Sequence, residues 1–268
     1  MRLARVAHPE HGVAFVTVDS VEEQDPAHAA TGGLDPQTNL REILAHPFGT
    51  PEYSGREWKL GESRLLAPIL PSKIIAFGRT YADHAAELGN QVPDQPLCFL
   101  KPSTAVIGPG AAIVLPPQSK QVSYEGELAV VIGRPCKDVP AEDVASVILG
   151  YTVGNDVTAR DLQTTDGQWA RAKGFDTFCP LGPWIETDLD SAALTIRTEI
   201  DGEVRQDGTT ADMVFTIGEL IEWISAAMTL LPGDVILTGT PQGVGLLESG
   251  QQASISVEGI GTLSNPVR

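Results

Sequence analysis

The stretch Val122-Ser-Tyr-Glu-Gly-Glu-Leu-Ala-Val-Val-Ile-Gly133 joins two acidic residues to a continuous apolar run. Alternate side chains of a strand point to the same face, so Glu125 and Glu127 are expected on one face, about 7 Å apart at their Cα atoms. Two like charges beside an apolar run repel each other and resist burial, which predicts a positive group between them. Gly126 has no side chain and leaves room for a close neighbour.

A third acidic residue follows another apolar run. Ile148–Val153 leads into Gly154-Asn-Asp156, and a turn there would place Asp156 at the end of a strand. Three carboxylates with no His or Cys nearby form an all-oxygen set, which suits Mg²⁺ or Mn²⁺ better than zinc. Two acids separated by one residue are also typical of a solvated strand face, so spacing alone leaves both interpretations open.

The rest of the chain predicts an α+β fold dominated by strands. Apolar runs alternate with Gly- and Pro-rich connections from about residue 65, without the regular strand–helix alternation of a doubly wound sheet. The other predicted strands are Lys73–Phe77, Ala129–Ile132, Leu194–Ile200, Asp234–Leu237 and Ala253–Val257.

Few helices are expected, and each is short. Thr80–Asp83 has the pattern of a capping box ahead of a helix over Ala82–Leu88, with Gly89 placed to end it. A second capping box, Thr216–Glu219, opens a helix with apolar residues at helical spacing, which Leu231-Pro-Gly233 would close.

Residues 1–65 are predicted to form a small N-terminal unit, and residues 66–268 the main domain. Arg2–Val6 and Val13–Val18 are β-rich runs joined by a turn, which predicts a hairpin. The acidic stretch Val21–Asn39 is expected to be a loop. A short helix is predicted over Leu40–Ala45, stopped by Pro47.

Composition restricts the partners and the compartment. The 268 residues carry 18 Lys and Arg against 35 Asp and Glu, a net charge of −17 that disfavours nucleic acid and anionic membranes as partners. No apolar stretch reaches the roughly 18 to 20 residues that cross a bilayer, and the N-terminus lacks the apolar segment of a secretory signal. We therefore expect a cytoplasmic protein. Three scattered cysteines, Cys98, Cys136 and Cys179, predict neither a disulfide framework nor a zinc site.

Taken together, the motifs resemble the fumarylacetoacetate hydrolase family over about residues 70 to 268. The resemblance implies a mixed β-roll, a bound Mg²⁺ or Mn²⁺ held by Glu125, Glu127 and Asp156, and a homodimer. One departure is Thr80, where related members often have Asn. The matching segments, in order, are Gly78–His84, Phe99–Thr104, Tyr124–Leu128, Gly154–Asp161, Arg171–Gly174 and Gly233–Pro241.

Members of this family act on small anionic 2-oxo acids and their enols. The first expectation for this chain is hydrolysis of the C–C bond of acylpyruvates such as fumarylpyruvate or acetylpyruvate, with the metal acting as a Lewis acid. Oxaloacetate decarboxylation, and isomerisation of 2-hydroxyhepta-2,4-diene-1,7-dioate in aromatic catabolism, are alternatives at the same site. A non-catalytic binding protein on the same scaffold is the alternative from another class.

The resemblance also assigns roles to individual residues. His84 and Glu87, three residues apart on one helix, would form a general base and its orienting carboxylate, although such a pair is also typical of an ordinary helix surface. Lys173 would contribute a point charge to the substrate, unless it is a solvated lysine. Asp161 would support the metal ligands from behind. The candidate substrate-binding residues are Arg79, Lys101, Gln163, Gly239 and Thr240.

Overall fold

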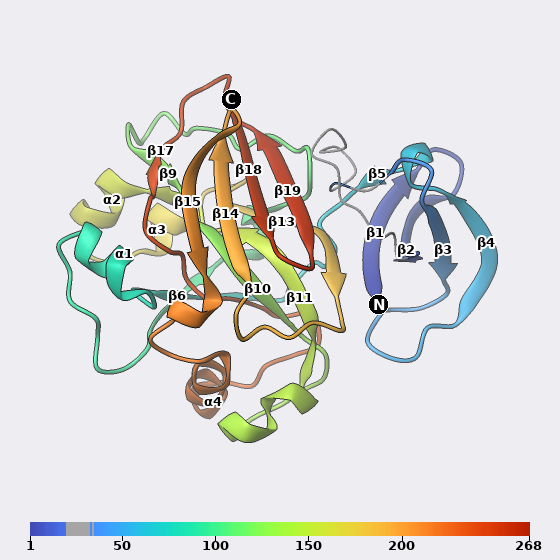
Figure 1. The fold of residues 1–268 in the computed structure, drawn as a ribbon, viewed down its shortest axis with the longest axis horizontal. Coiled ribbons are helices and arrows are strands. Elements are labelled where there is room, and N and C mark those ends of the chain that lie inside the picture. The colour runs from blue at the N-terminus through green and yellow to red at the C-terminus, as the bar shows by residue number, and fades with distance from the viewer. Residues whose placement is uncertain (20–32, 34) are drawn as a thin grey trace.

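The computed structural model describes residues 1–19, 33 and 35–268, and its largest feature is a mixed sheet (Figure 1). Ten strands follow one hydrogen-bonded path, and two short strands pair with β1 and β13 beside it. In path order the ten strands are β4 (Tyr53–Lys59), β3 (Asn39–Ile43), β2 (Gly12–Val18), β1 (Arg2–His8), β13 (Cys179–Glu186), β11 (Ile148–Asn155), β10 (Gly126–Ile132), β16 (Val235–Leu237), β6 (Ile74–Gly78) and β7 (Leu97–Lys101), and the two short strands are β5 (Arg64–Leu65) and β8 (Val106–Ile107).

Two smaller sheets, four α-helices and four short 3-10 helices complete the regular structure of the described residues. The four-stranded sheet has the order β15, β14, β18, β19, and the three-stranded sheet has the order β12, β9, β17. Their strands are β15 (Glu203–Thr209), β14 (Thr195–Ile200), β18 (Gln252–Val257), β19 (Gly261–Pro266), β12 (Thr158–Ala159), β9 (Val122–Tyr124) and β17 (Gly245–Leu246), and the helices are α1 (Ala82–Glu87), α2 (Arg160–Thr165), α3 (Ala170–Lys173) and α4 (Ile217–Ala227). The strand-dominated α+β prediction is confirmed.

The long sheet packs on both faces, and on one of them it meets the four-stranded sheet and α4. Leu128 on β10 and Val153 on β11 join a core with Ile196 and Ile255 of the four-stranded sheet. The adjoining core on that face packs the apolar side of α4 against Val130 of β10 and its neighbours. Because β10 is buried along its whole length, its register with β11 fixes the acidic residues at its start.

Two chain segments pass from the long sheet to the three-stranded sheet at the same place. Glu125 lies between the end of β9 and the start of β10, and Asp156 lies just after the end of β11 and before β12. Gly126 pairs with Asn155 in the long sheet, while Ser123 pairs with Thr158 in the small one. Two acidic residues are thus brought side by side at a junction of two sheets.

The N-terminal hairpin is confirmed, with Arg2 opposite Val18 and His8 opposite Gly12. Its first strand, β1, also pairs with β13, so the long sheet continues through the predicted N-terminal unit into the main domain (Figure 1). The helix predicted over Leu40–Ala45 is wrong. Those residues lie largely in β3, which pairs with β2 and β4, and this two-sided pairing outweighs a weak helical preference. Most of the loop predicted over 21–39 lies outside the described residues.

The two predicted capping boxes have opposite outcomes. Thr216 and Glu219 form the reciprocal bonds of a capping box at the start of α4, as predicted. At α1 the N-cap is Tyr81, without a capping side chain, and the hydroxyl of Thr80 donates instead to the carbonyl of Thr238. Gly89 follows α1 with a φ of +69°, in keeping with its predicted role in ending the helix. In the described ranges, no helix is both long and apolar enough to cross a membrane.

Candidate metal and substrate site

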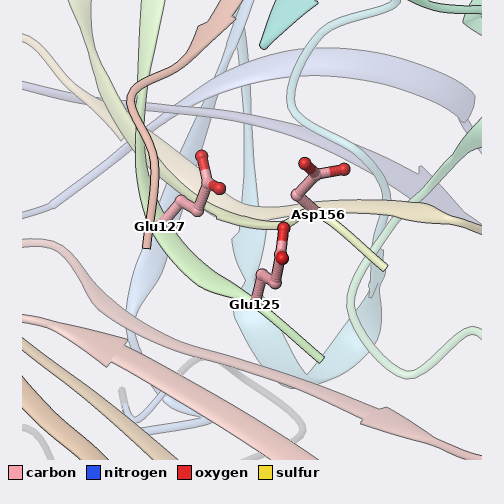
Figure 2. Close-up of side chains that lie close together, drawn as sticks. All are labelled: Glu125, Glu127 and Asp156. Atoms are coloured by element: carbon pink, nitrogen blue, oxygen red, sulfur yellow. The ribbon is translucent and has the colours of Figure 1, made fainter. Parts of the chain in front are cut away.

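Three carboxylates meet at the junction of the sheets. One oxygen from each of Glu125, Glu127 and Asp156 lies within 4.8 Å of the other two, and all three side chains are buried (Figure 2). Their exposed fractions are 4%, 1% and 1%, which excludes the alternative of a solvated strand face. Isolated buried carboxylates are strongly disfavoured, so this cluster requires compensating positive charge.

Three basic side chains supply that compensation. Lys173 Nζ lies 2.6 Å from Glu125 Oε2 and 2.6 Å from Asp156 Oδ2. Lys101 Nζ lies 2.5 Å from Asp156 Oδ1, and an Arg160 amino nitrogen lies 2.5 Å from Glu125 Oε1. A positive group is therefore present beside Glu125, but Lys173 bridges Glu125 and Asp156 and not the pair Glu125 and Glu127 for which it was predicted. Burial alone would raise the pKa of Glu125, but Arg160 and Lys173 together hold it well below its usual range.

Glu127 differs from its two neighbours because none of these cations bonds to it. Its Oε2 accepts a 2.8 Å hydrogen bond from the backbone N–H of Gly239, and its Oε1 accepts none from the described residues. Burial, followed by the charges of Asp156 and Glu125, raises the pKa of Glu127 well above its ordinary value. A cation placed beside Glu127 would reverse that balance and favour the ionised carboxylate.

A cavity of about 290 Å³ opens beside the carboxylates. Phe77 and Gly78 at the end of β6, the α1 region, and the α2–α3 region contribute to its wall. Seven of the residues predicted for the site line it: Arg79, His84, Glu125, Glu127, Gln163, Lys173 and Thr240.

His84 and Glu87 on α1 form a pair beside this cavity. His84 is 5% exposed and its Nδ1 lies 3.4 Å from Glu87 Oε2, while Glu87 also accepts the backbone N–H of Gly243. Burial lowers the pKa of the His84 imidazole, with opposing effects from nearby charges. The burial of His84 excludes the alternative of an ordinary helix surface, and the neutral ring is a suitable proton acceptor.

Three other predicted residues do not line the cavity and have partners within the protein. Lys101 does not line the cavity, because its buried Nζ is bonded to Asp156 and to the carbonyl of Val157. The N–H of Gly239 donates to Glu127, and Gly239 does not line the cavity. Asp161 accepts bonds from Ser119 and from backbone N–H groups at the start of α2, away from the carboxylate cluster.

Thr240 lines the cavity, but its hydroxyl has a partner on β10. It donates to the carbonyl of Gly126 and accepts from the side-chain amide of Gln206. Its hydroxyl therefore holds the backbone between the two glutamates. Arg171, beside Lys173 in sequence, is exposed and paired with Asp166, as expected for a solvated arginine.

Seven residues of the cavity wall were not among the predicted site residues, and two of them, Arg160 and Trp169, make contacts that hold the wall in place. Arg160 is the first residue of α2 and donates a hydrogen bond to Glu125. Two features of the sequence could have indicated it: the uncompensated charge of the acidic pair and the position of Arg160 within the Gly154–Asp161 motif. Trp169 packs so closely on Gly78 that a Cβ there would lie 2.9 Å from the indole. That contact joins β6 to the segment before α3, and spacing along the chain gives no signal of it.

Comparison with known proteins gives matches along the whole chain. Residues 73–268 match the family described as fumarylacetoacetate (FAA) hydrolase C-terminal, and residues 1–68 match Rv2993c-like, N-terminal. A crystal structure of 5-carboxymethyl-2-hydroxymuconate delta-isomerase from Mycobacterium smegmatis is 57% identical, with a TM-score of 0.90, covering 100% of this chain and 99% of that one.

Two more distant relatives carry other names. Oxaloacetate tautomerase Fahd2a from Rattus norvegicus is 44% identical, over 75% of this chain and 68% of its own length. Fumarylpyruvate hydrolase from Pseudomonas aeruginosa, solved with Mn²⁺ and pyruvate, is 33% identical with a TM-score of 0.70, covering 75% of this chain and 90% of that one. With a family match over 73–268 and a shared fold, the chain belongs to the fumarylacetoacetate hydrolase family.

Proposed function

We propose that this chain is a divalent-metal-dependent enzyme that transfers a proton within the enol form of a small 2-oxo acid, as an isomerase or tautomerase. The observation that carries the proposal is that Glu125 and Glu127 of the carboxylate cluster line one cavity together with the buried His84. Similarity to an isomerase that is 57% identical and to a tautomerase that is 44% identical supports proton transfer.

The residues present fit a hard divalent cation. Glu125, Glu127 and Asp156 offer only oxygen ligands, and Glu127 has an oxygen that no described hydrogen-bond donor uses. These three residues would hold Mg²⁺ or Mn²⁺, which take the same ligand type. The bound ion would supply Lewis acidity to the 2-oxo group of the substrate.

His84 would accept the proton that leaves one atom of the substrate and return it to another. Contact of Nδ1 with Glu87 favours a tautomer in which Nε2 is the free acceptor, and the N–H of Gly243 keeps Glu87 in place. Lys173 adds a fixed positive charge at the edge of the cavity, because Asp156 and Glu125 raise its pKa despite the opposing effect of burial. Arg79, also on the wall, would bind an anionic group of the substrate.

Acylpyruvate hydrolysis is the second candidate. It is favoured by similarity to the fumarylpyruvate hydrolase solved with Mn²⁺ and pyruvate, and by the same histidine, which would activate the attacking water. Oxaloacetate decarboxylation needs no such base. Replacing His84 should therefore abolish acylpyruvate hydrolysis and leave much of the decarboxylation.

The test compares wild-type protein and His84→Gln in Mn²⁺ buffer. Enol-to-keto conversion of oxaloacetate, formation of pyruvate from oxaloacetate, and cleavage of acetylpyruvate are followed in parallel. We expect His84→Gln to slow tautomerisation by about 100- to 10,000-fold while Mn²⁺ binding, followed by electron paramagnetic resonance, is retained.

Two control variants make the test specific. Glu125→Gln should lose both Mn²⁺ binding and turnover, while Arg171→Gln, on the exposed ion pair with Asp166, should behave as wild type. The proposal is wrong if wild-type protein turns over no 2-oxo acid, or if His84→Gln tautomerises oxaloacetate at the wild-type rate.

A further inference from the structure

A second cavity, of about 390 Å³, adjoins the one beside the carboxylates. The two cavities share five lining residues, Leu88, Asn90, Arg160, Gln163 and Thr164, so they are neighbouring chambers separated by those side chains. The chamber with His84 and the carboxylates is called the head chamber here, and the other the tail chamber. A ligand anchored in the head chamber that reached beyond Arg160 would enter the tail chamber.

The wall of the tail chamber is tied to the acidic cluster. Leu246 on β17 pairs with Ser123 on β9, two residues before Glu125, and both Leu246 and Ser123 line the chamber. In Figure 1 the β9–β17 pair lies on the same side of the molecule as α1 and α2. The distance between the two chambers is therefore set by hydrogen-bonded strands.

The tail chamber offers apolar surface. Leu246 is 54% exposed and Leu88 is 43% exposed, and both line this chamber together with Val244 and Gly245. Large apolar side chains left uncovered beside a polar site gain stability when a ligand covers them.

The tail chamber has no charge free to bind an anion. Arg160 is the only charged side chain among the described residues that line it. Its guanidinium donates to Glu125 at 2.5 Å, to the Ser123 hydroxyl at 3.2 Å and to the Gln163 side chain at 3.1 Å. A second carboxylate entering this chamber would lose its hydration without gaining an unpaired cation.

We propose that the tail chamber binds an uncharged apolar tail, so that the preferred substrates are 2-oxo monocarboxylic acids with an alkyl or acyl chain beyond C4. Leu246 and Val244 determine this preference. The inference rests on the proposed function, because it takes the 2-oxo acid group to be held in the head chamber.

The experiment measures binding to the Mn²⁺-loaded protein. Pyruvate, 2-oxobutanoate, 2-oxohexanoate and 2-oxooctanoate are titrated by calorimetry and tested as competitive inhibitors of oxaloacetate tautomerisation. We expect binding to tighten by about two- to fourfold for each methylene beyond C4, because each added group is removed from water. We also expect 2-oxohexanoate to bind more tightly than 2-oxoadipate, which has a second carboxylate at the end of the same chain.

Variants assign the effect to the chamber. Leu246→Ser and Val244→Ser should flatten the dependence on chain length and leave pyruvate binding unchanged, while Leu231→Ser, at an exposed leucine that lines neither chamber, should keep the wild-type dependence. The inference is overturned if wild-type affinity does not rise with chain length, if 2-oxoadipate binds more tightly than 2-oxohexanoate, or if both chamber variants keep the full dependence. Chain-length-dependent binding without any turnover would support the tail chamber and refute the proposed activity, so the two failures are distinguishable.

Discussion

The backbone N–H of Asp156 donates a 2.9 Å hydrogen bond to the carbonyl oxygen of Glu125. Two acidic residues from different connections between strands are therefore held side by side by the main chain, whatever their side chains bind. The two acids cannot move apart to reduce their mutual repulsion. Removing a cation that bonds to them should therefore have a direct effect on stability.

Replacing Lys173 by Met should strongly destabilise the metal-free protein. The change leaves Glu125 and Asp156 buried with one cation fewer, and breaking a buried ion pair from one side costs about 3–5 kcal/mol. Urea denaturation at neutral pH would measure the loss. Arg171→Met, two residues away in an exposed pair, is the matched control and should unfold at the wild-type midpoint. Equal midpoints for all three proteins would contradict the proposed charge balance.

Metal binding should release a proton from Glu127. Because the pKa of Glu127 is raised by burial, by Asp156 and by Glu125, its carboxyl is protonated over a pH range in which an ordinary glutamate is ionised. A bound cation requires the ionised form, so binding expels the proton and affinity rises with pH. Calorimetric titration of Mn²⁺ in buffers of different ionisation enthalpy would count the protons, and identical heats in all buffers would refute the prediction.

The same pKa shift has a consequence for stability. A carboxyl whose pKa is higher in the folded protein stabilises the fold below the ordinary glutamate pKa, and this contribution is lost as pH rises through the folded value. The metal-free protein should therefore lose stability over that range, and Glu127→Gln should lose less. Thermal unfolding of both proteins from acidic to mildly alkaline pH would test this, and parallel profiles would show that Glu127 is not responsible.

Gly126→Ala should destabilise the strand that carries the acidic residues. A Cβ at Gly126 would collide with the hydroxyl of Thr198 and lie 3.1 Å from Ile255 Cγ2, both on the neighbouring four-stranded sheet. Overpacking of this kind costs about 1–3 kcal/mol. Gly49→Ala is the matched control, because a Cβ there meets nothing within 4 Å, and it should unfold like wild type. Equal unfolding free energies for the two variants would show that Gly126 is not tightly packed against the four-stranded sheet.

Cys179 should resist alkylation in the native protein. It is fully buried on β13, and burial raises the pKa of its thiol to about 12, so little thiolate forms at neutral pH. Cys98 and Cys136 are partly exposed and should react first with iodoacetamide. Mass spectrometry of digested protein would locate the label, and early labelling of Cys179 would mean that β13 opens locally.

The acidic cluster was predictable because its signals are local. The two glutamates are separated by one residue, and the alternation of side chains along a strand places them on one face. The apolar run beside them indicates that this strand is buried. The β1–β2 hairpin and the capping box of α4 were predictable for the same reason, since both depend on residues close in sequence.

The wrong predictions concern residues whose structure depends on partners far away in the sequence. Residues 40–45 have no strong local preference, and only the pairing of β3 with β2 and β4 makes most of them a strand. Lys101 looked free to bind a substrate because nothing in its own segment indicates that it meets Asp156, 55 positions later. The role of Arg160 was equally invisible, because the carboxylate it contacts is contributed by the junction of two other strands.

By pairing with β13, the first strand of the N-terminal hairpin protects the edge of that strand from other chains. Without residues 1–68, the edge of β13 that now bonds Arg2 and Leu3 would present unpaired peptide groups to water. Unpaired N–H and C=O groups at a strand edge can form hydrogen bonds with a strand of a second polypeptide. The truncated protein would therefore be prone to aggregate. The hairpin thus shields the sheet that holds the acidic cluster, although it contributes no side chain to the cavity beside it.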